Sequence, residues 1–116
     1  MTLRELASIL EAEVISGEQY LDTEFECAGA SDLMSDVLAF GVPGLVLLTG
    51  LTNTQSVRTA DIVEAKGIVY VRGKKPNKEG IALAQERGIP ILSTKFFMYK
   101  ACGLLYRQEI AGVRNQ

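Results

Sequence analysis

Three apolar segments recur along this sequence, and each is followed by a loop and a helical pattern. They read GLVLLTG at 44–50, IVYVRG at 68–73 and IPILST at 89–94. A strand that is apolar along its whole length has both faces buried, and its alternation with helices indicates a parallel sheet covered on both sides. The repeat therefore predicts an α/β fold, a three-layer α/β/α sandwich with a small, mostly parallel sheet.

The remaining elements follow from caps and apolar spacing. Thr2 and Glu5 form a capping-box pattern, and Ser31 or Asp32 is expected to cap a second helix that continues to about residue 40. Gly67 and Gly88 each follow a cation and precede a buried strand, which predicts left-handed helix stops. The other expected helices cover about 3–11, 54–66, 78–87 and 96–108, and two short strands are expected at 13–17 and near 25–28.

The length of 116 residues and the 47% hydrophobic content suit one compact domain. We expect this domain to cover residues 1–110, and the aperiodic tail at 111–116 to be frayed. The longest apolar run, 42–48, is too short to span a bilayer, and the first residues lack a signal-peptide pattern. These features predict a cytoplasmic protein without a membrane partner.

Several kinds of chemistry lack the residues they need. The sequence contains no histidine, which is the commonest general base and metal ligand. Cys27 and Cys102 are far apart and form no CxxC pair, so we expect two small buried side chains. Asp32 and Asp36 have the spacing of a magnesium pair, but acids are also favoured in a first helical turn. We therefore predict no catalytic residue, metal or cofactor.

Three loops are expected at one edge of the sheet, because parallel strands place their carboxyl ends together and open α/β sheets bind ligands there. Helix N-termini, hydroxyls and cations would suit a nucleotide or a phosphorylated metabolite. Helix capping and solvated lysines explain the same residues without a ligand. A nucleic-acid partner is not expected, because the net charge is −2 and the basic loop 72–78 has no aromatic residue. The candidate ligand-binding residues are Thr49, Gly50, Thr52, Asn53, Arg72, Lys74, Lys75, Ser93, Thr94 and Lys95.

The segments AGASDLMSDVL at 28–38, LVLLTG at 45–50, KGIVYVRGKKPN at 66–77 and ERGIPILST at 86–94 together resemble the DRTGG domain. The likeness runs from about Thr2 to Tyr106. It implies a fold similar to the N-terminal domain of HPr kinase. It also implies a noncatalytic regulatory or dimerising role, as in the DRTGG modules of some phosphotransacetylases and CBS-containing pyrophosphatases. The run D-R-T-G-G itself is absent, and Leu51 stands where many members have a second glycine.

The leading hypothesis from the sequence is a noncatalytic regulatory or interaction domain that forms a homodimer or binds another protein. The first alternative is a domain that senses a nucleotide or phosphorylated small molecule at the three-loop edge, and the second is an enzyme that acts with another chain. At least one of the four bulky residues 96–99 should be exposed, because one helix cannot turn them all inward. The candidates for an apolar interaction patch are Val42, Leu51, Phe96, Phe97, Met98 and Tyr99.

Overall fold

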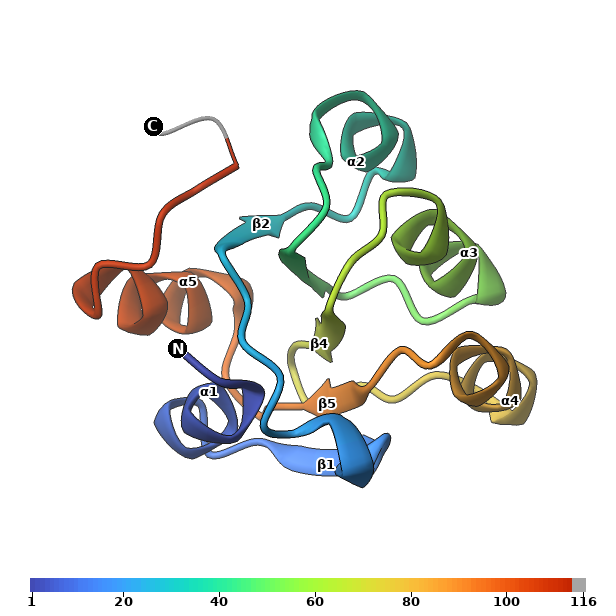
Figure 1. Cartoon of the computed structure of the whole chain (residues 1–116), viewed down its shortest axis with the longest axis horizontal. Helices are drawn as coiled ribbons and strands as arrows, with labels where there is room; N and C mark the ends of the chain where they lie inside the picture. The colour runs from blue at the N-terminus through green and yellow to red at the C-terminus, as the bar shows by residue number, and fades with distance from the viewer. Residues whose placement is uncertain (114–116) are drawn as a thin grey trace.

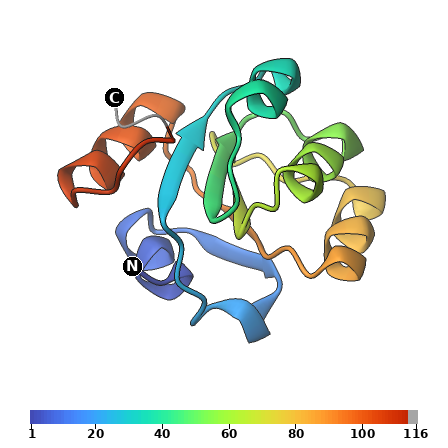
Figure 2. The same ribbon diagram turned by 45° about the horizontal axis from the view of Figure 1, so that its top comes forward.

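A five-stranded sheet lies between two layers of helices in the computed structural model, which describes residues 1–113 (Figure 1). Helices α1 and α5 cover one face, and α2, α3 and α4 cover the other, as the turned view in Figure 2 also shows. The elements in chain order are α1 Leu3–Ile9, β1 Glu13–Ser16, the 3₁₀ turn η1 Glu18–Tyr20, β2 Cys27–Ala30, α2 Met34–Phe40, β3 Leu45–Thr49, α3 Thr54–Ile62, β4 Gly67–Tyr70, α4 Lys78–Arg87, β5 Ile91–Ser93 and α5 Met98–Arg107.

The strands lie in the order β1-β5-β4-β3-β2. Strands β2, β3, β4 and β5 are parallel to their neighbours, and only the edge strand β1 runs antiparallel, against β5. The prediction of a three-layer α/β sandwich with a mostly parallel sheet is confirmed. The register aligns Thr49 with Tyr70 and Tyr70 with Ser93, so three strands end at the same level.

The core has two halves, one on each side of the sheet. Along β3 the side chains alternate, with Leu45 and Leu47 in the half under α2–α4 and Val46 and Leu48 in the half under α1 and α5. Every residue of β3 and β4 is buried. This explains why these strands are apolar along their whole length, as a strand covered on both faces requires.

Capping residues and glycine stops in the sequence predict some helix ends correctly and others wrongly. The capping box of Thr2 and Glu5 is present, and α4 ends where Gly88 adopts a φ of +69°. The matching stop at Gly67 was predicted wrongly, because Gly67 already belongs to β4. Helix α3 ends early, at Ile62, and Glu64 takes the left-handed conformation with a φ of +58°.

The start of α2 also differs from the sequence prediction. Its N-cap is Leu33, whose side chain makes no capping bond, so neither Ser31 nor Asp32 caps the helix. Ser31 Oγ instead accepts a hydrogen bond from the backbone N–H of Leu33 at 3.0 Å. Strand β2 begins two residues later than predicted, which brings Asp32 to the carboxyl edge of the sheet.

The chain after α5 returns to the edge strand β2. The carbonyl of Ala111 accepts a hydrogen bond from the N–H of Ala28 at 2.9 Å, and Gly112 forms a parallel bridge with Ala28. Residues 111–113, which the sequence predicts to be part of a frayed tail, are therefore tied to the sheet. The rest of that predicted tail, 114–116, lies outside the described residues.

Candidate functional site

The loops after β3, β4 and β5 meet at one edge of the sheet, as the repeat predicts. The N–H of Val71 donates to the carbonyl of Thr49 at 3.1 Å, which joins the first loop to the second. The N–H groups of Arg72 and Gly73 donate to the carbonyls of Phe96 and Thr94, both at 2.8 Å, which joins the second loop to the third. The geometric expectation is confirmed, while ligand binding by these residues stays a prediction.

Gly50 lies at the centre of this edge, between an acid and a base. The backbone N–H of Gly50 donates to Asp32 Oδ1 at 2.6 Å, and the hydroxyl of Thr49 donates to the same oxygen at 3.1 Å. A Cβ added to Gly50 would lie 2.6 Å from Arg72 Nη2 and 3.4 Å from both carboxylate oxygens of Asp32. The missing side chain thus lets the guanidinium of Arg72 and the carboxylate of Asp32 approach each other over a bare α-carbon.

Asp32 belongs to this edge, although the sequence pattern indicated it only as a possible helix cap or as part of a magnesium pair with Asp36 and not as one of the candidate ligand-binding residues. Its carboxylate accepts charge-assisted hydrogen bonds at the place where the N–H of Gly50 would meet an anionic ligand. The signal that pointed to it was its position just after β2, whose carboxyl end lies at the same edge. Placing that strand two residues too early assigned Asp32 to a helix cap instead.

The hydroxyls of Ser93 and Thr94 are engaged within the chain. Ser93 Oγ donates to the carbonyl of Lys74 at 2.7 Å, and so fixes the second loop over the end of β5. Thr94 Oγ1 is buried and donates to the carbonyl of Leu10 at 2.6 Å, while it accepts from the N–H of Phe96 at 3.2 Å. Thr94 therefore connects this edge to the end of α1 and does not face outward with the lysines.

The loop before α3 is held by a buried pair of hydroxyls. The sequence leaves open whether Thr52 or Asn53 caps α3; Asn53 is the N-cap, but its side chain makes no capping bond. Ser56 Oγ donates to the Asn53 carbonyl at 2.8 Å, which leaves Tyr70 to donate to Ser56 Oγ across 2.7 Å. Burial raises the pKa of Tyr70, and the hydrogen bond with Ser56 offsets part of that effect.

The cations of the edge do not all lie in one group. Arg72 is exposed above Gly50, and Lys74 and Lys95 are exposed on the neighbouring loops. Lys75 instead forms an ion pair with Glu13 Oε1 at 3.0 Å. Because Glu13 belongs to β1, at the opposite side of the sheet from β2, Lys75 is drawn away from Asp32. Arg72 is therefore the cation best placed at the centre of the edge.

Helix α5 presents a second candidate surface on its outer side. Tyr99 is 92% exposed, Tyr106 is 68% exposed, and Phe97, just before the helix, is 67% exposed. A shallow hollow of about 640 Å³ runs along this side and is lined in part by Cys102 and Gly103. An unpartnered aromatic surface of this kind is typical of an interaction site.

The sequence predicts that at least one of the four bulky residues 96–99 is exposed, and this is confirmed. Phe97 and Tyr99 are exposed, as the argument about four consecutive bulky residues requires, whereas Phe96 and Met98 pack against the core. Leu51, another patch candidate, also packs against the core. Tyr106 was not among the candidates, although its spacing of seven residues from Tyr99 places both on one helix face.

Neither a cluster of metal ligands nor a membrane-spanning helix occurs in residues 1–113. No group of three or more histidine, cysteine, aspartate or glutamate side chains in this part of the chain is arranged to hold a metal ion. No helix in it is long and apolar enough to cross a bilayer. Both cysteines are free thiols, and burial raises the pKa of Cys27 and of Cys102.

Comparison with known proteins gives a structural match. No family model and no curated protein sequence matches this chain. The chain is similar to the regulatory region of a Clostridium perfringens pyrophosphatase, solved with its CBS and DRTGG domains in complex with the activator diadenosine tetraphosphate. The TM-score is 0.73 at 17% identity, and the match covers 90% of this chain but 45% of that one. The likeness supports a DRTGG-like fold.

Proposed function

We propose that this chain is a noncatalytic regulatory domain of the DRTGG type, which works by associating with a second copy of itself. The observation that carries the proposal is the outer side of α5, where Tyr99 and Tyr106 are both exposed; Phe97, just before the helix, is a further exposed aromatic residue. Phe and Tyr side chains of this kind are enriched at protein interfaces and depleted on free surfaces. A regulatory domain can transmit a signal by such a contact without any catalytic group of its own.

The similarity to the pyrophosphatase region supports the regulatory part of this proposal. That region is described as regulatory and binds an activator, and it belongs to an enzyme. The match covers 45% of the pyrophosphatase region, which also contains CBS domains. We therefore also propose that this domain acts on a partner protein or enzyme. The lack of histidine agrees with a role without catalysis.

Size-exclusion chromatography with light scattering tests the self-association. One chain has a mass of 12.6 kDa, and we expect the measured mass to rise toward twice this value as the loaded concentration increases. A mass that stays at that of one chain up to millimolar concentration would refute the homodimer. Release of phosphate from nucleotides or pyrophosphate by the purified chain, above the buffer rate, would refute the noncatalytic role.

A second function is favoured by the arrangement around Gly50. Its N–H and the guanidinium of Arg72 converge at the carboxyl edge of the sheet, where open α/β folds bind their ligands. An anionic ligand such as a nucleotide or a phosphorylated metabolite would contact the guanidinium of Arg72 and would compete with Asp32 for the N–H of Gly50. The activator bound by the pyrophosphatase region belongs to the same chemical class. We therefore propose nucleotide sensing at this edge as the alternative.

Thermal denaturation with a panel of nucleotides tests the alternative, with diadenosine tetraphosphate and inorganic pyrophosphate included. A ligand at 100 times its dissociation constant stabilises the folded state by about 2.7 kcal/mol, which moves the melting temperature measurably. The shift should disappear in Arg72→Ala and weaken in Lys74→Ala or Lys95→Ala, while Lys75→Ala should retain it because Lys75 pairs with Glu13. No shift with any phosphorylated compound would exclude the sensing role.

A further inference from the structure

The outer stripe of α5 has the same order of large and small residues in both chain directions. Tyr99, Cys102, Gly103 and Tyr106 follow the spacing of one helix face, with a tyrosine at each end and two small residues in the middle. The opposite face of α5 belongs to the core, because Ala101 and Leu105 are buried there against the sheet. In an antiparallel pair, this stripe would place tyrosine beside tyrosine at its ends and small residue beside small residue in its middle.

No contact within the described part of the chain requires a glycine at position 103. A Cβ built on Gly103 would meet no atom within 4 Å, although glycine in the middle of a helix is less favourable than alanine. Gly80, the glycine of α4, differs because a Cβ there would lie 3.1 Å from Pro76 Cβ. The glycine at 103 is thus explained by close approach from outside the chain, as small residues allow between packed helices.

The exposed area suits a second copy rather than a large partner. Aromatic side chains bury roughly 150–250 Å² each, so Tyr99 and Tyr106, both exposed by two-thirds or more, offer roughly 320 Å² per copy. A standard interface takes about 800 Å² from each side, and the flanking residues of α5 can add part of the difference. A contact smaller than the standard interface is expected to give a weak, transient dimer.

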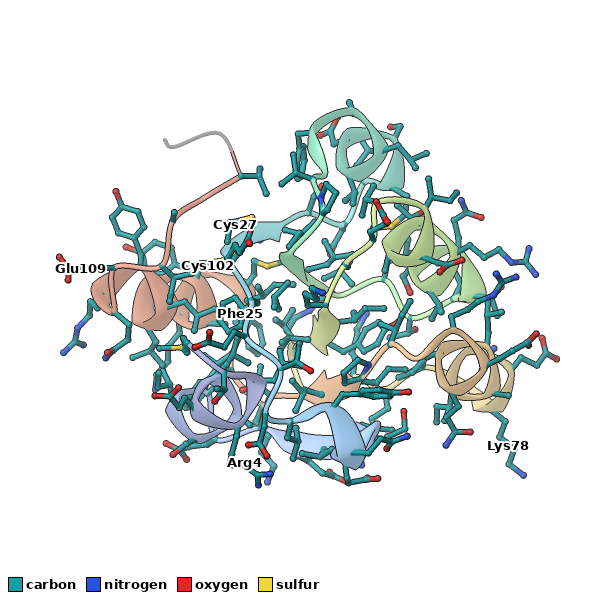
Figure 3. All side chains as sticks on the ribbon, in the orientation of Figure 1. Arg4, Phe25, Cys27, Lys78, Cys102 and Glu109 are labelled. Carbon is teal, nitrogen blue, oxygen red and sulfur yellow. The ribbon has the colours of Figure 1, made fainter. Side chains whose placement is uncertain are left out.

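We propose that two copies pair through α5 in an antiparallel arrangement, with a twofold axis between Cys102 and Gly103. This geometry rests on the self-association proposed above. It places Tyr99 opposite the partner's Tyr106, and Cys102 opposite the partner's Gly103. Arg107 then lies beside the partner's Tyr99, where a cation and an aromatic ring attract each other. Glu109, just beyond the helix, points away from the sheet in Figure 3 and lies at the rim of the contact.

Sedimentation equilibrium of point variants tests the contact. Gly103→Ala should weaken dimerisation about tenfold or more, because a methyl group enters a close helix contact. At concentrations where the chain is monomeric, the same substitution should raise the melting temperature by about 3–6 °C, because alanine favours the helix. Tyr99→Ala and Tyr106→Ala should each weaken dimerisation about tenfold or more. Ile62→Ala, which alters an exposed apolar residue on α3, is the matched control and should leave dimerisation unchanged.

Disulfide trapping tests the orientation. In a Cys102→Ser background, one chain carries Tyr99→Cys and another carries Tyr106→Cys, because the proposed axis places residue 99 opposite the partner's residue 106 on the contact face. The two chains are mixed at a high concentration, since each substitution also weakens the contact. After mixing, diamide takes two electrons and two protons from each thiol pair as the disulfide forms. Mass spectrometry should then find mostly the mixed dimer. Dimers of the Tyr99→Cys chain alone, formed as readily, would indicate a parallel pair and overturn the geometry.

The outcomes separate the two levels of the proposal. A chain that stays monomeric at every concentration defeats both the self-association and its geometry. A dimer whose dissociation constant is unchanged by Gly103→Ala, Tyr99→Ala and Tyr106→Ala keeps the proposed function and refutes the pairing through α5.

Discussion

Asp32 Oδ1 lies 2.6 Å from the backbone nitrogen of Gly50, so a carboxylate after β2 accepts the first free N–H after β3. The hydroxyl of Thr49 donates to the same oxygen, and the guanidinium of Arg72 lies near the Asp32 carboxylate over the α-carbon of Gly50. The chain thus places its own anion where an external anion would be held. This contact joins two loops that a sequence pattern treats as separate, and it controls both the stability and the ligand chemistry of the edge.

Replacing Asp32 by alanine should destabilise the fold. The N–H of the buried Gly50 would lose its acceptor, and a hydrogen bond to a charged group is worth about 1.5–3 kcal/mol. Asp32→Asn keeps an acceptor oxygen and should lose less. Urea denaturation measures both variants, and an unfolding free energy equal to that of the wild type in Asp32→Ala would show that the contact has no weight.

The same carboxylate should oppose anion binding if the edge is a ligand site. Removing its charge in Asp32→Asn should tighten binding of pyrophosphate or nucleotides, because the repulsion and the competition for the N–H of Gly50 both weaken. Isothermal titration calorimetry compares the two proteins. Equal affinity in both proteins would show that the charge of Asp32 does not affect ligand binding. Weaker affinity in Asp32→Asn would show that the carboxylate itself helps to bind the ligand.

Two glycine substitutions should differ strongly in cost. Gly50→Ala meets the far end of the flexible Arg72 side chain, so we expect a loss below about 1 kcal/mol together with displacement of the guanidinium. Gly17→Ala meets Pro90 Cα at 2.6 Å and must adopt a φ of +86°, which should cost about 2–4 kcal/mol. Denaturation midpoints decide this, and equal losses would contradict the packing described for either site.

The stability should fall at alkaline pH. Burial raises the pKa of Tyr70 above its ordinary value of 10.0, so the folded state holds the proton more tightly than the unfolded state. The stabilisation is then complete below pH 10 and is lost as pH rises through the raised pKa. The thiols of Cys27 and Cys102 act in the same direction from about pH 9. Tyr70→Phe should flatten the decline, and an identical pH profile in this variant would contradict the assignment.

Thr94 should prove structural. Thr94→Val keeps the shape of the side chain but leaves the carbonyl of Leu10 without its donor, which should cost about 1–3 kcal/mol. Thr52→Val, a similar change on the first loop, is the control and should be near neutral. If Thr94→Val kept full stability but lost ligand binding, the result would contradict a structural role and support Thr94 as a ligand-binding group.

Features set by neighbouring residues were predictable from the sequence. The helix at 78–87 was placed correctly, because Asn77 Oδ1 accepts the N–H of Gly80 and Gly88 supplies the left-handed stop. The parallel sheet followed in the same way from fully apolar strands. Once adjacent parallel strands are accepted, the meeting of their carboxyl ends follows from topology alone.

Features set by distant contacts were not predictable. Asp32 read as a helix cap because its partners, Thr49 and Gly50, are 17 and 18 residues away. The stop at Gly67 failed because Glu64 takes the left-handed conformation, which the sequence pattern reserves for glycine. The contacts of side chains at the edge depend on such distant partners, so the pattern predicted which loops meet but not the contact of Asp32 with Thr49 and Gly50.

Nuclear magnetic resonance of the labelled chain over a range of concentrations tests the self-association through α5 most directly. Amide shifts should change with dilution and should be confined to residues 97–107 and their immediate neighbours, with the same dissociation constant at each. Shifts that do not depend on concentration, or that gather instead around Ile62 on α3 or another surface away from α5, would contradict the account.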